Sequence, residues 1–185
     1  LELISYKKNI VDFTTGVSIN NLALNENDIG DFRTFLKLSP PLRTEEDRVA
    51  LIDGINKNLI DVIVSDHKPE DEESKRLTFS QAATGASGIE TFLSLALEQF
   101  HNGSIKLEKI IELITHNPAK ILKIDKGNLS VGVNADFCIV DISKPWIVKK
   151  ENLVSKSKNT SIEGRKLQGK VLSTFVKGQE LYKIK

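Results

Sequence analysis

The side chains best placed to do chemistry in this sequence are Asp66 and His67, which directly follow an apolar run at residues 60–65. The run is rich in β-branched residues and does not alternate, which predicts a parallel strand covered on both faces. In β/α architectures, catalytic groups project from the carboxyl ends of such strands. A carboxylate there could be a metal ligand, a general base, or both in turn. The structural alternative is that Asp66 caps the next loop and His67 is its hydrogen-bonded neighbour.

A second candidate lies around two prolines, where Ser39 precedes and Arg43 closely follows them. Residues 33–38 alternate loosely, and the prolines forbid both a helix and a central strand. The pattern therefore predicts a strand that ends in a fixed loop. Arg43 suits an anionic substrate, but pairing with Glu46 or Asp47 at a helix entry explains it equally well.

A third candidate is the small-residue segment at residues 82–88, which contains Thr84 and Gly85. Such a backbone can approach a ligand closely, and its exposed N–H groups could bind a carboxylate or a carbonyl. Ser87 and Glu90 have the spacing of a capping box, so a helix is expected to begin there.

Ligands for a metal ion are few. The histidines are His67, His101 and His116, and neither His-x-His nor His-Glu-x-x-His occurs. His101 falls at an expected helix C-terminus, where a cation is favourable without any ligand role. The single cysteine, Cys138, excludes an internal disulfide and a multi-thiolate site, and its apolar setting predicts a buried strand. The sequence therefore predicts that these 185 residues do not complete a catalytic metal site alone.

The elements that must position these candidates follow a β/α order up to residue 124 and are mostly β afterwards. Thr44 and Asp47 form a capping-box pattern before a helix of about 14 residues. Residues 68–75 are almost all charged, which predicts a solvated loop. Further strands are expected at residues 17–19, 60–65, 137–141, 146–148 and 171–176, helices at 89–101, 107–115 and from 117, and a hairpin turn at 177–180. The fold class is α/β, with one unit at residues 1–124 and a small β unit at 125–185.

Composition and charge narrow the class of partner. The 185 residues are 39% hydrophobic and 28% charged, with a net charge of +1, as in a globular protein with a core. Without a basic face or an apolar run of about 18 residues, nucleic acid and membrane are disfavoured as partners and a small-molecule site is favoured. No signal-peptide pattern occurs, so a cytoplasmic location is expected. The missing methionine, and a length below the roughly 250 residues of an α/β barrel, indicate part of a longer chain.

Seven motifs follow one another along the chain, and the last two lie in its tail. They are Lys37–Arg48, Ile60–His67, Gly85–Thr91, Thr115–Ala119, Gly127–Asp136, Ser157–Gly164 and Gly169–Val171. From about Val17 to Tyr182 this ordered set resembles bacterial dihydroorotases. The Gly127–Asp136 element is common to metal-dependent amidohydrolases, whereas the ordered set is specific.

The resemblance implies a (β/α)₈ TIM barrel that carries a small β subdomain, with this chain as the C-terminal part. It implies that Asp66 closes the last barrel strand, contacts the metal and accepts the proton of the metal-bound water. It also implies that Ser39 stands where the family usually has a substrate-binding asparagine. Thr84 and Gly85 would lie where backbone groups meet the dihydroorotate ring.

The departures from the family pattern concern the metal and the substrate. Asn20 and Asn21 fall where a histidine ligand to zinc is expected, so Asn21 is a candidate position of the metal site; His67 is a further candidate ligand. Glu70 falls where the family can have a second, substrate-binding histidine. The His-x-His pair and the carboxylated lysine of the earlier barrel strands are absent.

Three functions are compatible with these features. The first is a zinc-dependent dihydroorotase that interconverts N-carbamoyl-L-aspartate and (S)-dihydroorotate in pyrimidine (UMP) biosynthesis, with this chain inactive by itself. The second is a non-catalytic dihydroorotase-like subunit that is a structural partner of a carbamoyltransferase. The expected assembly is a homodimer or an association with a carbamoyltransferase. The third is another cyclic amidohydrolase, such as a hydantoinase. Asp66 favours the first function, whereas Asn21 favours the second.

Overall fold

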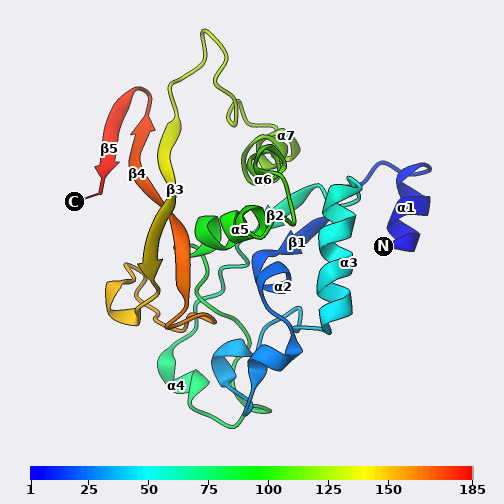
Figure 1. The fold of residues 1–185 in the computed structure, drawn as a ribbon, viewed down its shortest axis with the longest axis vertical. Coiled ribbons are helices and arrows are strands. Elements are labelled where there is room, and N and C mark those ends of the chain that lie inside the picture. The colour runs from blue at the N-terminus through cyan, green and yellow to red at the C-terminus, as the bar shows by residue number, and fades with distance from the viewer. Residues whose placement is uncertain (185) are drawn as a thin grey trace.

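The computed structural model describes residues 1–184, in which helix α5 (Phe92–His101) lies between two small sheets (Figure 1). One sheet pairs β1 (Gly16–Ser18) with β2 (Val62–Val64) in parallel. The other is antiparallel, in the order β3 (Phe137–Ile147), β4 (Lys166–Val176), β5 (Gln179–Lys183). The α/β class expected from the sequence is confirmed.

The remaining elements are helices and single turns. The α-helices are α1 (Glu2–Lys8), α2 (Ile19–Ala23), α3 (Glu45–Asn56), α4 (Glu72–Lys75), α6 (Leu107–Ile111) and α7 (Asn117–Ile121). The 3₁₀ turns are η1 (Glu26–Ile29), η2 (Thr34–Leu36) and η4 (Lys150–Asn152), and a π-helical turn, η3 (Glu112–His116), joins α6 to α7. None of the helices in the described range is long and apolar enough to cross a membrane.

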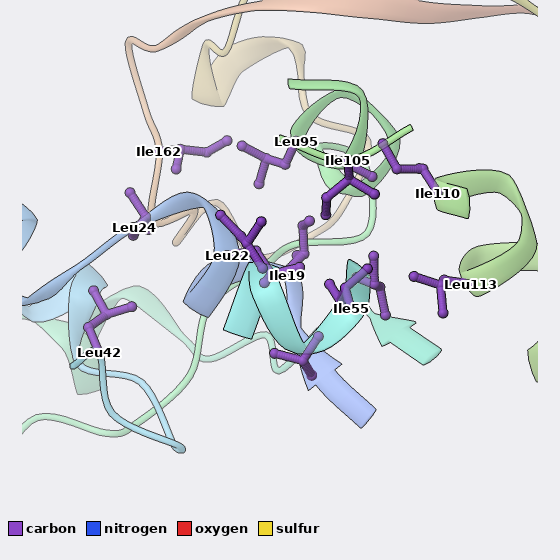
Figure 2. Packing of buried hydrophobic residues seen from close by; sticks show 14 of the residues in the cluster. Ile19, Leu22, Leu24, Leu42, Ile55, Leu95, Ile105, Ile110, Leu113 and Ile162 are labelled. Atoms are coloured by element: carbon purple, nitrogen blue, oxygen red, sulfur yellow. The ribbon is translucent and has the colours of Figure 1, made fainter. Parts of the chain in front are cut away.

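The core lies where α2, α3 and α5 pack beside the parallel sheet (Figure 2). Ile19, Leu22, Ile55 and Leu95 are 0–1% exposed. Fully burying a side chain of this size contributes about 1.5–3 kcal/mol before entropy is counted. The core therefore fixes both strands, and with them the loops that leave their carboxyl ends.

The first residue pair of the parallel sheet is Gly16 with Val62, and hydrogen bonds between the two preceding residues, Thr15 and Asp61, hold the strands in this register. Asp61 accepts hydrogen bonds at Oδ2 from Thr15 N at 2.7 Å and Thr15 Oγ1 at 2.9 Å, and its Oδ1 lies 2.7 Å from Lys8 Nζ. Burial acts to raise the pKa of Asp61, but these bonds outweigh it and the pKa lies below its usual value. Because the strands are parallel, their carboxyl ends open at the same edge.

Several local predictions are confirmed. Thr44 caps α3, since its Oγ1 accepts from Asp47 N at 3.2 Å, although the helix has 12 residues. The apolar run at 60–65 forms the parallel strand β2 at residues 62–64. The expected cover on both faces is wrong for the described residues, since Ile63 is buried but Val64 is 45% exposed. Lys177 and Gly178 form the turn between β4 and β5, where the positive φ of Gly178 suits a tight hairpin.

Two predictions of local structure were wrong near the candidate site. Residues 33–38 contain the 3₁₀ turn η2 at Thr34–Leu36 rather than a strand, because no neighbouring strand pairs with them in the described part of the chain. Residues 68–75 are not a fully solvated loop: they end in α4, where Lys75 is 1% exposed. Its ammonium group finds carbonyl partners in the interior, a tertiary effect that a run of charges does not reveal.

Two further predictions were also wrong. Ser87 does not cap a helix; α5 begins at Phe92 after Thr91, and Ser87 hydrogen bonds to the tail of the chain instead. Cys138 is exposed rather than buried. It lies in β3, and an antiparallel sheet need not be covered on both faces as a parallel one is.

Candidate active site

Asp66 lies two residues beyond the carboxyl end of β2, in the loop that leaves the parallel sheet. Its φ is +48°, a left-handed conformation that few residues other than Gly, Asn and Asp adopt readily. The side chain is half-buried, and within residues 1–184 its carboxylate takes part in no hydrogen bond or ion pair. A carboxylate held in this way remains free to bind a ligand or to accept a proton.

His67 is used to fix the neighbouring backbone. Its Nδ1 accepts from the N–H groups of Gly88 at 3.2 Å and Ile89 at 3.3 Å. Two donors at Nδ1 require the neutral ring to carry its proton on Nε2. Nδ1 is therefore occupied and cannot serve as a metal ligand in this arrangement, which favours the structural interpretation of His67.

The small-residue segment 82–88 packs directly beside the end of β2. Lys68 N donates to Ala86 O at 3.0 Å, and His67 and Ala86 form a parallel bridge. A Cβ added at Gly85, where φ is +137°, would lie 2.7 Å from Lys68 O. Glycine is thus required because two backbones meet here, and the segment comes to lie beside the loop that carries Asp66.

The segment also contacts residues 37–43, which contain Pro40 and Pro41 and are called the proline loop below. Gly85 N donates to Lys37 O at 2.9 Å, two residues before Ser39, which is exposed. The Gly85 N–H is therefore already engaged and is not open to a ligand, unlike the exposed N–H groups expected from the sequence. Thr84 is half-buried, and its Oγ1 lies 3.3 Å from Lys68 Nζ.

Lys75 is a buried cation that joins the same loops. Its Nζ donates to the carbonyl oxygens of Ala83 at 2.7 Å, Thr34 at 3.1 Å and Lys37 at 3.4 Å. Burial lowers the pKa of Lys75 to about 8, with Glu70 opposing the shift. Sequence reasoning missed this residue because it stands in a run of charges that predicts a solvated loop.

Asn159 is the second residue that the sequence did not single out. It is 2% exposed and donates from Nδ2 to Gly85 O at 3.2 Å. Its Oδ1 accepts from Ser87 Oγ at 3.1 Å and from Glu70 N at 3.3 Å. The only feature of the sequence that pointed to Asn159 was its position in the motif Ser157–Gly164.

The segment at residues 157–161, which contains Asn159, contacts α2 and the loop that follows β2. Ser157 Oγ donates to Glu70 O at 2.5 Å, and Ser161 Oγ donates to Asn20 Oδ1 at 3.0 Å. Part of the C-terminal unit expected at 125–185 therefore packs onto the unit expected at 1–124.

Comparison with known proteins places this arrangement in a family. The model of the amidohydrolase family matches residues 11–181. The chain belongs to the amidohydrolase family. It is 38% identical over 183 residues to the dihydroorotase of Ehrlichia canis and 40% identical over 184 residues to that of Aquifex aeolicus. These alignments cover 98% and 99% of the chain but only 41% and 43% of the relatives, so the chain spans about two fifths of their length.

Solved structures of amidohydrolases share the fold. The L-hydantoinase (dihydropyrimidinase) of Arthrobacter aurescens superposes with a TM-score of 0.90 at 29% identity, over 98% of this chain and 42% of that one. The dihydropyrimidinase of Brevibacillus agri gives a TM-score of 0.89 at 21% identity, with the same coverage, and shows the fold alone.

The remaining candidates of this amidohydrolase differ in placement. Glu70 Oε1 lies 3.8 Å from Lys68 Nζ, beside the loop that carries Asp66. Arg43 is exposed and pairs with Asp47 at 3.7 Å, which matches its structural interpretation. Asn21 lies on α2 and donates from Nδ2 to Pro41 O at 3.1 Å, so its amide holds the proline loop.

Amidohydrolases are generally metal-dependent, and the residues present can be tested against that requirement. A catalytic zinc needs at least three protein ligands that converge. Nowhere in residues 1–184 do three His, Cys, Asp or Glu side chains cluster in this way. Asp66 could supply one ligand, but the residues of this chain alone do not fit a complete metal site.

A cavity of about 630 Å³ lies elsewhere, between α5 and the antiparallel sheet. Its lining includes Trp146 and Lys170, whose ammonium group lies 3.5 Å from the centre of the indole ring. None of the candidate site residues lines this cavity. This cavity is therefore separate from the candidate site at the carboxyl end of β2.

Proposed function

We propose that the full-length protein that carries this chain is a dihydroorotase, which interconverts N-carbamoyl-L-aspartate and (S)-dihydroorotate in pyrimidine synthesis. The observation that carries the proposal is the 38–40% identity to dihydroorotases over nearly the whole chain. The free carboxylate of Asp66 at the end of β2 supports it, because the reaction needs a group that accepts and returns a proton.

Asp66 is the proposed general base. Hydrolysis of the ring amide requires that an attacking water lose a proton and that the leaving nitrogen gain one. A half-buried carboxylate without a cationic partner can perform both transfers in turn.

The proposed substrate contacts are Ser39, Thr84 and Gly85, with weaker proposals for Glu70 and Arg43. Gly85 links two of these places, because its N–H binds the backbone two residues before Ser39. Since that N–H is engaged, we propose that the substrate packs against the Gly85 peptide by van der Waals contact and accepts no hydrogen bond from its N–H. Arg43 would have to leave Asp47 in order to bind an anionic substrate.

For the complete enzyme we propose a (β/α)₈ barrel, to which residues 1–124 contribute the last part and residues 125–185 a small β subdomain. The coverage of about two fifths of each dihydroorotase supports this arrangement. The segment at 157–161 belongs to the proposed subdomain by its position in the sequence. Its side chains nevertheless hydrogen bond to residues 20 and 70, which belong to the proposed barrel.

Zinc is the cofactor that we propose for the complete enzyme, where it would polarise the substrate carbonyl. Asp66 is the proposed ligand from this chain, Asn21 remains a proposed neighbour, and segments outside these 185 residues would supply the other ligands. A small-molecule substrate, a cytoplasmic location and a homodimer or an association with a carbamoyltransferase also remain proposals.

The test is a substrate panel on the protein expressed from its complete gene, with zinc supplied. Hydrolysis of dihydroorotate and cyclisation of N-carbamoyl-L-aspartate are expected, with little activity on hydantoin or dihydrouracil. Preference for hydantoin would support the alternative of a hydantoinase, which the TM-score of 0.90 to L-hydantoinase favours. No turnover of any cyclic amide would favour the non-catalytic subunit.

A further inference from the structure

We propose that Asn159 is a positioning residue that holds the Gly85 peptide in the orientation the substrate meets. The inference deepens the proposed dihydroorotase function and rests on it, because Gly85 is one of the proposed substrate contacts. Asn159 itself is 2% exposed, and it acts through the backbone of the small-residue segment.

Gly85 needs a restraint from outside its own segment. It has no side chain with which to pack, and its φ of +137° is strongly disfavoured for other residues. Its N–H is fixed by Lys37 O at 2.9 Å, and its carbonyl oxygen is fixed by Asn159 Nδ2 at 3.2 Å. Both polar groups of this residue are therefore held, one of them by a side chain 74 positions away.

The amide of Asn159 fits this task at both of its ends. Ser87 Oγ and Glu70 N donate to Oδ1 at 3.1 and 3.3 Å, and those donors orient the group so that Nδ2 faces Gly85. Ser87 N also donates to Asn159 O at 3.1 Å, which aligns the two backbones. The same side chain thus binds the proposed contact Gly85 and the backbone of Glu70.

The nature of the amide yields a sharp test, because only its nitrogen donates. An aspartate at position 159 has nearly the same shape and keeps the acceptor for Ser87. It replaces the donor to Gly85 O by an oxygen, so two acceptors would face each other. The peptide of Gly85 is then expected to turn or to shift, while the attachment to Ser87 remains.

The experiment compares Asn159→Asp with Asn152→Asp in the full-length protein. Asn152 is exposed in η4, seven positions earlier, and its replacement adds the same charge to the same part of the chain. We expect KM for dihydroorotate to rise by about tenfold or more in Asn159→Asp, with a smaller fall in kcat, and no change in Asn152→Asp. A general loss of folded enzyme would lower kcat and leave KM unchanged.

Hydrogen exchange of the same proteins gives a readout that does not need activity. Amides of residues 84–88 are expected to exchange at least about tenfold faster in Asn159→Asp, while amides of α3 are unchanged. Unchanged KM in an active enzyme, or unchanged exchange at 84–88, would overturn the role of Asn159. If Asn159→Asp does not fold, Asn159→Ala compared with Asn152→Ala removes the donor to Gly85 O without adding a charge.

The two proposals can fail separately. A folded wild-type protein without dihydroorotase activity would overturn the proposed function and, with it, the link from Asn159 to substrate affinity. An active wild type with an unaffected Asn159→Asp variant would leave the function standing and would refute the positioning role.

Discussion

The ammonium group of Lys75 donates to the carbonyl oxygen of Ala83 at 2.7 Å, although Lys75 is only 1% exposed. The same nitrogen reaches Thr34 O and Lys37 O, so one cation ties the segment beside Asp66 to the proline loop. Lys75 thus secures the small-residue segment at Ala83, and Asn159 secures it at Gly85.

Replacing Lys75 by methionine is expected to lower the free energy of unfolding by about 1–3 kcal/mol. Methionine fills similar space but leaves buried carbonyls without their donor. The matched control is Arg76→Met directly after the same short helix, where the arginine is exposed and pairs with Glu72 and Glu73. Exposed pairs contribute little, so the control should change stability by less than about 1 kcal/mol. Equal effects in denaturant titrations of the full-length protein would contradict the structural role of Lys75.

Stability should also depend on pH through Lys75. Burial lowers its pKa to about 8 in the folded protein, against an ordinary value of 10.5, with Glu70, Lys37 and Lys68 as its charged neighbours. Between these values the unfolded chain binds more protons at this position, so stability rises with pH across the window. The rise is up to about 1.4 kcal/mol per pH unit.

The measurement is the difference in unfolding free energy between wild type and Lys75→Met at about pH 7.5 and about pH 9.5. This difference cancels the contributions of the other lysines. The unfolding free energy of the wild type should increase relative to that of Lys75→Met as the pH increases. A difference that is the same at both pH values would show that Lys75 titrates as an exposed lysine does.

The account of Gly85 is tested by Gly85→Ala with Gly103→Ala as its control. Both glycines have a positive φ, but a Cβ at Gly85 would lie 2.7 Å from Lys68 O, whereas one at Gly103 meets nothing within 4 Å. The control should cost about 1 kcal/mol for its backbone conformation, and Gly85→Ala about 1–3 kcal/mol more. Equal costs in thermal unfolding would mean that the two backbones do not meet at Gly85.

Asp61 offers a test of what fixes the parallel sheet. Asp61→Ala removes the acceptor for both Thr15 donors and for Lys8, and should lower stability by about 2 kcal/mol at neutral pH. Because the folded pKa is lowered, this contribution is present above the usual pKa of 3.8 and is lost as the pH falls through the folded value. Asp53→Ala, at an exposed position of α3, is the control and should be neutral. An effect of Asp61→Ala no larger than that of Asp53→Ala would contradict the anchoring role.

The sequence predicted those features that depend on local pattern. The β-branched run before Asp66 indicated a parallel strand, and the spacing of Thr44 and Asp47 indicated a capped helix, because these signals depend on neighbours in sequence. Lys75 and Asn159 could not be predicted as links between loops, since their partners come from other segments of the chain. Cys138 was wrongly predicted to be buried, because an apolar run alone does not show how many faces of a sheet are covered.

The central claim is that Asp66 is the general base of a dihydroorotase, and Asp66→Asn in the full-length protein tests it most directly. Asp71→Asn is the control, because Asp71 is an exposed N-cap of α4 and asparagine caps equally well. We predict that kcat for dihydroorotate hydrolysis falls by about 10² to 10⁴-fold in Asp66→Asn, with the thermal midpoint unchanged, and stays at the wild-type value in Asp71→Asn. An Asp66→Asn enzyme that keeps its kcat within about threefold of wild type would contradict the account.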